Sequence, residues 1–220
     1  MAARQKPGLR KTNVGVRKPG KHRRDALLRA AYDLLCDHSL EDITFLDIAG
    51  KAQIPEGSAY HFFANRYDVF MALSDELDQR FVALVTEAVP ARSRGTWQHL
   101  VRHQLTRVAR LYNDTPPARK LLIGGTTPPV FQQQERIRER LAGQVSYEVY
   151  ARYFELPEIP RPRDVFFYYV ELTHVLFSLS VIEHDRIVKP MLDEAIRVGI
   201  AYLGLYLPET LPARSAGEQS

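Results

Sequence analysis

The sequence contains few of the residues that mark secreted or disulfide-stabilised proteins. It has a single cysteine in 220 residues, Cys36, which argues against an internal disulfide framework and is expected on the apolar face of a first helix. The N-terminus is charged but has no apolar segment, so no secretory signal peptide is expected. A reducing cytoplasm is therefore the expected compartment.

Catalytic and cofactor motifs are also missing. The chain has no GxSxG, no phosphate-binding loop and no GxGxxG, and Gly124-Gly125 is better explained as a helix terminator. His99 and His103 have the i, i+4 spacing at which two imidazoles can share a metal. Leu100 stands where an HExxH motif has glutamate, however, and no third ligand is apparent. The sequence thus predicts no enzyme, no metal and no cofactor.

Acidic residues are absent from the first 24 positions, which hold nine of the 30 Lys and Arg. Residues 1–21 are also rich in Gly and Pro, so we expect a disordered basic arm. Such an arm adds salt-dependent, sequence-independent affinity for nucleic acid through counterion release. The basic residues nearest the rest of the chain are Arg17, Lys18, Lys21, Arg23 and Arg24. A solvated tail or a cloning remnant is the alternative interpretation.

No segment alternates apolar and polar residues as a strand does, so the fold is predicted to be all-α. The most informative stretch is residues 43–73. Thr44 with Asp47 three residues later predicts a helix start, and Gln53–Ile54 is the expected turn before Pro55 opens the next helix. Asn65 is expected to cap a longer helix, whose apolar residues repeat with a period of 3.6: Val69, Phe70, Leu73, Leu77, Phe81 and Leu84.

An amphipathic helix over residues 26–40 (LLRAAYDLL) precedes the segments TFLDIAGKA, IPEGSAYHFF and NRYDVFMAL. Together they resemble, in order and without gaps, the DNA-binding domain of TetR-family transcriptional regulators over about residues 22–73. Two positions depart from the family: Gln53 stands where glycine is usual in the turn, and Pro55 replaces the usual serine before the recognition helix. If the φ of Gln53 is positive, we expect a cost of about 1 kcal/mol.

The resemblance implies which residues contact DNA. Phosphate contacts fall to Thr44, Tyr60, His61 and Arg66, and base contacts to Glu56, Gly57, Ser58 and Ala59. Glu56 either accepts a hydrogen bond from the N4 amino group of cytosine or only supports the helix N-terminus. Tyr60 and His61 have a second interpretation, as aromatic side chains that pack the third helix onto the first.

Beyond Phe81 the resemblance is one of length and helical character. Helices are expected over about residues 96–112, capped by Thr96, and over 115–124, 128–154, 163–185 and 190–206. Residues 165–182 are apolar enough to span a membrane, but Glu171 and His174 near the middle favour a buried helix. With the four helices expected before residue 96, this gives about nine helices in two domains.

The expected organisation is a basic arm (1–21), a three-helix helix-turn-helix DNA-binding domain (22–66), a helical ligand-binding and dimerisation domain (67–207) and a polar tail (208–220). Candidate ligand contacts are polar or aromatic residues on otherwise apolar helices: Trp97, His103, Gln104, Tyr112, Phe131, Tyr147, Tyr150, Phe167, Glu171, His174 and Phe177. The family precedent of a four-helix dimer interface implies Val181, Met191, Ala195, Val198, Gly199 and Tyr202 at the homodimer contact.

We therefore predict a ligand-responsive, dimeric transcriptional regulator, a repressor that a small, mostly apolar effector releases from a palindromic DNA operator. A constitutive DNA-binding dimer without an effector is the close alternative, and a pocket without continuity to the fourth helix would favour it. A scaffold that binds nucleic acid without sequence preference is a third possibility.

Overall fold

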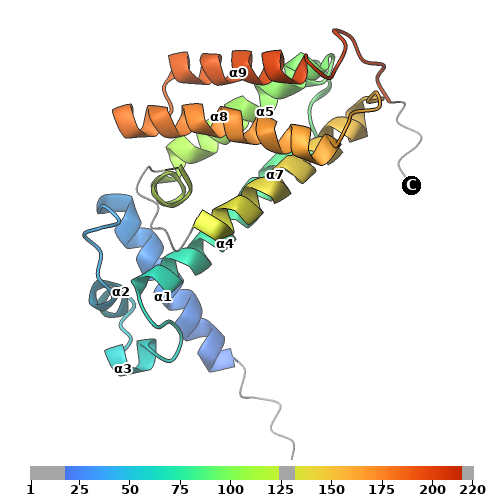
Figure 1. Cartoon of the computed structure of the whole chain (residues 1–220). Helices are drawn as coiled ribbons and strands as arrows, with labels where there is room; N and C mark the ends of the chain where they lie inside the picture. The colour runs from blue at the N-terminus through green and yellow to red at the C-terminus, as the bar shows by residue number, and fades with distance from the viewer. Residues whose placement is uncertain (1–17, 124–131, 215–220) are drawn as a thin grey trace, which may run out of the picture.

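The computed structural model describes residues 18–123 and 132–214, which form nine α-helices and no β-strand (Figure 1). The helices are α1 (Lys18–Asp37), α2 (Phe45–Lys51), α3 (Glu56–Ala59), α4 (Arg66–Thr86), α5 (Trp97–Asp114), α6 (Pro116–Ala118), α7 (Gln132–Tyr153), α8 (Pro162–His184) and α9 (Lys189–Leu203). A short 3-10 helix, η1 (Ala91–Ser93), and a π-helical turn, η2 (Arg119–Ile123), complete the described chain. The prediction of an all-α fold is confirmed.

Three helix starts predicted from capping residues are confirmed. The Thr44 hydroxyl accepts a hydrogen bond from Asp47 N at 3.2 Å, and the Asp47 carboxylate accepts one from Thr44 N at 2.8 Å, which is a complete capping box. Asn65 Oδ1 accepts from the backbone N–H of Tyr67 and of Asp68. Thr96 Oγ1 accepts from His99 N in the same way. Each cap uses hydrogen bonds that span at most three residues, which is why the local sequence predicts them.

The first helix begins earlier than predicted. Residues 18–21, expected in the disordered arm, form the first turn of α1, where a proline is tolerated because the N–H groups there lack intrahelical partners. Cys36 is exposed and not on the apolar face, because Leu35 takes the inward position beside it. The other predicted helix limits agree with the structure within about three residues wherever the residues are described.

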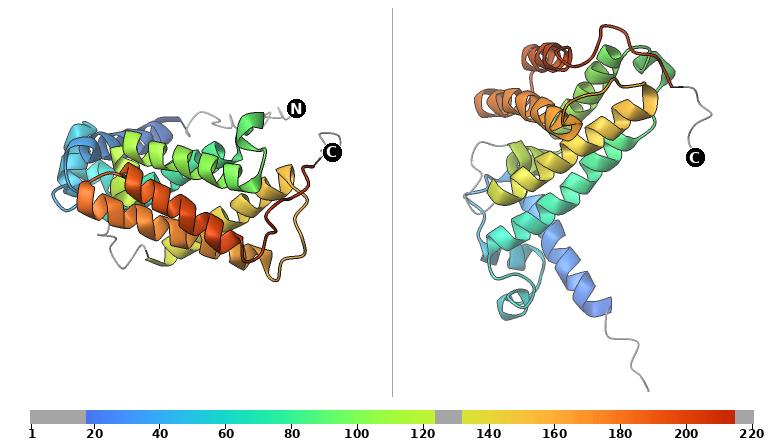
Figure 2. Two further views of the ribbon diagram at one scale, coloured as in Figure 1. Left: turned by 90° about the horizontal axis from the view of Figure 1, so that it is seen from above. Right: turned by 45° about the vertical axis from the view of Figure 1, so that its right-hand side comes forward.

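The helices form two parts that share α4. In Figure 1, α1, α2 and α3 lie at one end of the molecule, and α8 and α9 run side by side at the other. Helix α4 extends from the first part to the second, where it packs on α5 and α7 (Figures 1 and 2). Near its start, Val69 and Phe70 are fully buried, and further along Leu77 is buried. One rigid helix therefore belongs to both cores.

Helices α7 and α8 cross in close contact at Gly143. A Cβ atom at this position would lie 2.6 Å from the Cα and 2.7 Å from the N of Phe167, closer than any real side-chain carbon approaches a backbone. Only a residue without a side chain allows this crossing. Gly199 on α9 plays a similar part, since its Cβ would lie 2.8 Å from the ring of Tyr169 on α8.

Helix α8 is, among the described helices, the one long and apolar enough to cross a membrane by length and composition. It packs against α7 on one side and α9 on another, and its Phe166, Tyr169 and Phe177 side chains are buried. This arrangement is that of a core helix.

Candidate nucleic-acid interface and ligand cavity

The turn between α2 and α3 is a Schellman motif. Ile54 N donates to Ala49 O and Gln53 N to Gly50 O, both at 3.0 Å, and Ile54 is buried beneath the turn. Gln53 occupies the left-handed position of this motif with a φ of 55°. The positive φ considered from the sequence is thus present, on a residue whose Cβ makes it unfavourable.

Replacing Gln53 with glycine is expected to raise the free energy of unfolding by about 0.5 to 1 kcal/mol, because glycine adopts this φ without steric cost. Urea unfolding at fixed protein concentration measures the change. Gln53→Ala is the matched control: it removes the same polar group but keeps a Cβ, so it should bring no gain. Equal gains from both variants would show that the strain does not lie in the backbone.

The recognition helix α3 begins one residue later than predicted. Pro55 is the N-cap residue, with φ −53° and ψ 136°, and not the first residue of the helix. Glu56 and Gly57 are exposed, and Ser58 is half-buried. Ala59 is fully buried in the core of the small domain that α1, α2 and α3 form, so the predicted contact of Ala59 with a base is wrong. A residue directed at the core cannot also reach the major groove.

Tyr60 packs the recognition helix onto α2 and not onto the first helix, and its phosphate contact remains a prediction. Its ring packs on Phe45 of α2, with the ring centroids 4.7 Å apart, while half of the side chain remains exposed. The ring therefore holds α3 against α2, and the residue still reaches solvent. His61 and Thr44 are exposed on the same small domain.

Arg66 is engaged within the protein. Its Nη1 donates to Ile43 O at 2.7 Å and to Glu41 O at 3.0 Å, and its Nη2 donates to the Tyr67 hydroxyl at 3.0 Å. These bonds fix the loop that leads into α2. A phosphate contact by Arg66 remains a prediction. It would have to use the guanidinium N–H groups that are not engaged in these hydrogen bonds.

The basic residues assigned to the arm differ in position. Lys21, Arg23 and Arg24 lie on α1 and are exposed. The Arg24 guanidinium lies over the ring of Phe63, 5.4 Å from its centroid, beside the recognition helix. Arg17 and the side chain of Lys18 lie outside the described residues.

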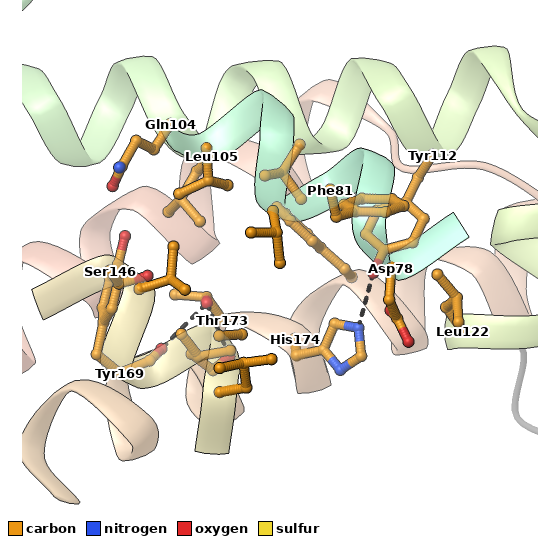
Figure 3. Close-up of a pocket in the computed structure, with 18 residues that line it drawn as sticks. Asp78, Phe81, Gln104, Leu105, Tyr112, Leu122, Ser146, Tyr169, Thr173 and His174 are labelled. Atoms are coloured by element: carbon orange, nitrogen blue, oxygen red, sulfur yellow. Dashed lines mark hydrogen bonds between the residues drawn. The ribbon is translucent and has the colours of Figure 1, made fainter. Parts of the chain in front are cut away.

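A cavity of about 170 Å³ lies in the larger part of the molecule, between α4, α5, α7 and α8 (Figure 3). Its wall is mostly apolar. Four of the predicted ligand contacts line it: Gln104, Tyr112, His174 and Phe177. Other lining residues were not predicted, among them Asp78, Phe81, Val82 and Val85 of α4 and Tyr169 and Thr173 of α8. The one sequence signal for the α4 residues was the apolar repeat of that helix, which includes Phe81.

The polar groups of the cavity lie at its two ends (Figure 3). At one end, His174 Nε2 lies 3.2 Å from the Tyr112 hydroxyl, and burial lowers the pKa of His174 to about 4, which keeps the imidazole neutral at pH 7. At the other end, Gln104 is buried and its Nε2 has no hydrogen-bond partner among the described residues. A buried amide donor without a partner is unfavourable, so a ligand acceptor is the natural group to satisfy it.

The overall structure matches solved structures, although no family model and no curated protein sequence matches the chain significantly. A TetR-family regulator from Streptomyces coelicolor is 25% identical and aligns over 84% of this chain and 99% of its own, with a TM-score of 0.61. A TetR regulator from Rhodococcus sp. RHA1 is 17% identical over 83% of this chain and 96% of its own, with a TM-score of 0.62. The multidrug binding protein EbrR, crystallised with imidazole, is 17% identical over 88% and 97%, with a TM-score of 0.54.

The chain has the fold of the TetR-family transcriptional regulators. These neighbours support a DNA-binding transcriptional regulator, and they are not enzymes. The resemblance read from residues 22–73 is thereby confirmed, and the fold extends it over most of the chain.

Within this TetR fold, six predicted ligand contacts lie away from the cavity, and Phe131 lies outside the described residues. Trp97 is buried and donates from Nε1 to Pro208 O at 2.9 Å. Tyr147 and Tyr150 pack on Phe166, and Phe167 lies under the guanidinium of Arg140. Glu171 does not line the cavity, and His103 faces a separate groove. The predicted cavity role of these residues is wrong, because the residue pattern of a helix does not show which of its sides faces the cavity.

The predicted dimer contacts also need correction. Ala195 and Gly199 face the interior against α8, and Val181 is buried, so these three are not available to a second subunit. Met191, Val198 and Tyr202 are half-buried and remain candidates. The sequence did not single out five large apolar residues that are exposed along one face of α8, which we call the α8 stripe: Tyr168, Leu172, Val175, Leu179 and Ile182.

Proposed function

We propose that this protein is a dimeric, ligand-responsive repressor that leaves a palindromic operator when a small, mostly apolar effector fills the cavity. The observation that supports ligand response is the path of α4. Asp78, Phe81, Val82 and Val85 of this helix line the cavity, and the same helix begins at Arg66, directly after the recognition helix and its following turn. The pocket is therefore continuous with the fourth helix, which argues against a constitutive dimer.

A second connection runs through η2. Leu122 lines the cavity, and two residues earlier Lys120 Nζ donates to Leu35 O at 2.8 Å and to His38 O at 2.9 Å, at the C-terminal end of α1. A π-helical turn is an uncommon element that often occurs at functional sites. An effector that repositions α4 and η2 would rotate the helix-turn-helix domain, and it would shift the population off DNA by its differential affinity for the two states.

The cavity limits the chemistry of the effector. A cavity of about 150 Å³ is large enough for benzene, so about 170 Å³ fits a small aromatic or branched aliphatic molecule. Gln104 offers a donor at one end and the Tyr112–His174 pair offers polar atoms at the other. EbrR, a structural neighbour, is named a multidrug binding protein and was crystallised with imidazole, which is in keeping with a pocket for small molecules on this fold.

The α8 stripe supports the homodimer. Its residues recur at spacings of four and three, so they lie on one face of α8. This face is exposed and is not the one that packs against α7 or α9. An exposed apolar row of this length on an otherwise packed helix is typical of a protein interface. A two-fold symmetric contact through the α8 stripe would allow the two α3 helices to enter successive major grooves of an inverted repeat. The proposed setting is the cytoplasm, with DNA as the main partner.

Selection of bound DNA from a random pool tests the regulator directly. We expect an enriched inverted repeat, with affinity that falls as salt rises because the basic residues add counterion release. Uniform binding of all sequences would favour the scaffold and contradict the operator. Small aromatic molecules that raise the melting temperature should then release the selected DNA; if ligands bind but never change DNA affinity, the protein is a constitutive dimer.

Replacing Tyr60 with phenylalanine is expected to weaken DNA binding about tenfold for every sequence, because it removes a phosphate hydrogen bond to a charged group. The variant keeps the ring that packs on Phe45, so stability should not change. Fluorescence anisotropy on the selected operator and on random DNA measures the effect. Glu56→Gln is the contrasting variant: it should alter preference at one base pair, and an equal loss on all sequences would contradict the cytosine contact.

A further inference from the structure

A second hollow lies on the other side of α5 from the cavity. This basic groove, of about 600 Å³, lies between the end of α4, η1 and one face of α5. Its cationic and imidazole side chains are Arg92, His99, Arg102, His103, Arg107 and Arg110. None of its lining residues lines the apolar cavity.

The α5 residues of the groove recur at spacings of three and four, so they form one helix face. The opposite face of the same helix, with Gln104, Leu105 and Val108, lines the apolar cavity. The pair His99 and His103, which suggested a metal from the sequence, belongs to this cationic face. The described residues contain no group of three metal-ligating side chains, and the neighbouring arginines would repel a cation.

The positive charge of the groove is largely uncompensated. Glu87 is its one lining carboxylate, and it pairs with Arg107. Arg92, Arg102 and Arg110 make no hydrogen bond or ion pair with any described residue. Asp193 on α9 interacts with Arg102 through charge alone and forms its ion pair with Lys189. Like charges at helical spacing repel one another, so this arrangement is unfavourable unless an anion lies among them.

His103 supplies a buried hydrogen-bonding group. Its Nε2 is buried and has no partner among the described residues. Burial, and then the charges of Arg107 and Arg92, lower the pKa of His103, so the neutral ring can donate one N–H to a ligand oxygen. An unpartnered polar atom beside uncompensated arginines is the pattern expected for an anion-binding site.

We propose that the basic groove binds a small phosphate-bearing anion with two or more negative charges. Arginine is the side chain best suited to hold phosphate oxygens, because its planar donors form paired charge-assisted hydrogen bonds. DNA held at α3 does not reach this site, since the groove starts at Glu87, about 30 Å along α4 from Arg66. Helix α5 separates the groove from the effector cavity, so the two ligands can bind at once.

Isothermal titration calorimetry of the full chain with inorganic pyrophosphate tests the proposal, in a chloride buffer of constant ionic strength. We expect one saturable site per chain with a Kd below about 1 mM. The double variant Arg102→Gln/Arg110→Gln should weaken binding about tenfold or more, because each arginine supplies a charged hydrogen bond. Arg163→Gln, which removes an exposed charge from α8, is the control and should leave the Kd unchanged.

Three results would overturn the proposal. Pyrophosphate that does not saturate, or that binds equally well to the double variant, would show that the groove is no phosphate site. Citrate that binds as tightly as pyrophosphate would contradict the phosphate class. Loss of affinity for random-sequence duplex DNA in the double variant, with pyrophosphate binding intact, would assign the groove to nucleic acid.

Discussion

Val175→Arg is expected to convert the protein from a dimer to a monomer and to weaken binding to an inverted-repeat operator by about a hundredfold or more. Val175 is 55% exposed at the centre of the α8 stripe, so the substitution leaves the interior of the subunit untouched. In a two-fold interface it would bring two unpaired charges together out of water, which costs several kcal/mol. A monomer then binds one half-site and loses the gain from simultaneous engagement.

Sedimentation velocity and fluorescence anisotropy on the selected operator measure the two effects of Val175→Arg. The matched control is Ile137→Arg on α7, where the side chain is 64% exposed and lies outside the α8 stripe. This control should remain a dimer with unchanged DNA affinity. A Val175→Arg protein that still sediments as a dimer would place the interface on another surface and would refute the role of the stripe.

Gly143→Ala is expected to lower the free energy of unfolding by about 3 kcal/mol, although alanine favours a helix over glycine by about 1 kcal/mol. The new methyl group would meet the backbone of Phe167 at 2.6 Å, and a backbone cannot move aside as a side chain does. Helices α7 and α8 would have to separate along their crossing. The melting temperature should fall by about 6 to 12 °C for a domain of this size.

The control for Gly143→Ala is Gly50→Ala on α2. A Cβ at Gly50 meets nothing within 4 Å, so the same chemical change should raise the free energy of unfolding by about 0.5 to 1 kcal/mol through helix propensity alone. Urea unfolding at one protein concentration measures both variants, since the stability of the proposed dimer would depend on concentration. Stabilisation by both alanines would mean that the α7–α8 crossing has room for a methyl group.

The sequence predicted helix α8 but did not predict which of its faces is exposed. The sequence predicts that residues 165–182 form a buried helix, and the contacts of α8 with α7 and α9 confirm this prediction. The sequence did not show that Tyr169 and Phe177 face inward while Val175 and Leu179 remain exposed. The rotation of α8 about its axis depends on how α7 and α9 pack on it. A helix with apolar residues on most of its sides does not show from sequence which side faces the core.

The same limit explains why the sequence predicted only part of the cavity wall. Four of the eleven predicted contacts line it, and the four α4 residues that connect it to the recognition helix were not among the predictions. Buried Arg119 was also missed: its guanidinium donates to the carbonyls of Tyr112 and Asn113 at the end of α5, and it pairs with Asp185 after α8. These partners are six to 66 residues away, and nothing in the local sequence marks them.

What the sequence alone determined is local. Thr44, Asn65 and Thr96 set the helix starts, the Gln53–Ile54 step set the turn, and the absence of strand alternation set the all-α class, because caps, turns and periodicity arise within a few residues. The local sequence did not show that Ala59 is buried, that Lys120 caps α1, or that one face of α5 borders a cavity while the other carries the basic groove. These features depend on how helices distant in sequence rotate and cross, and packing fixes that geometry.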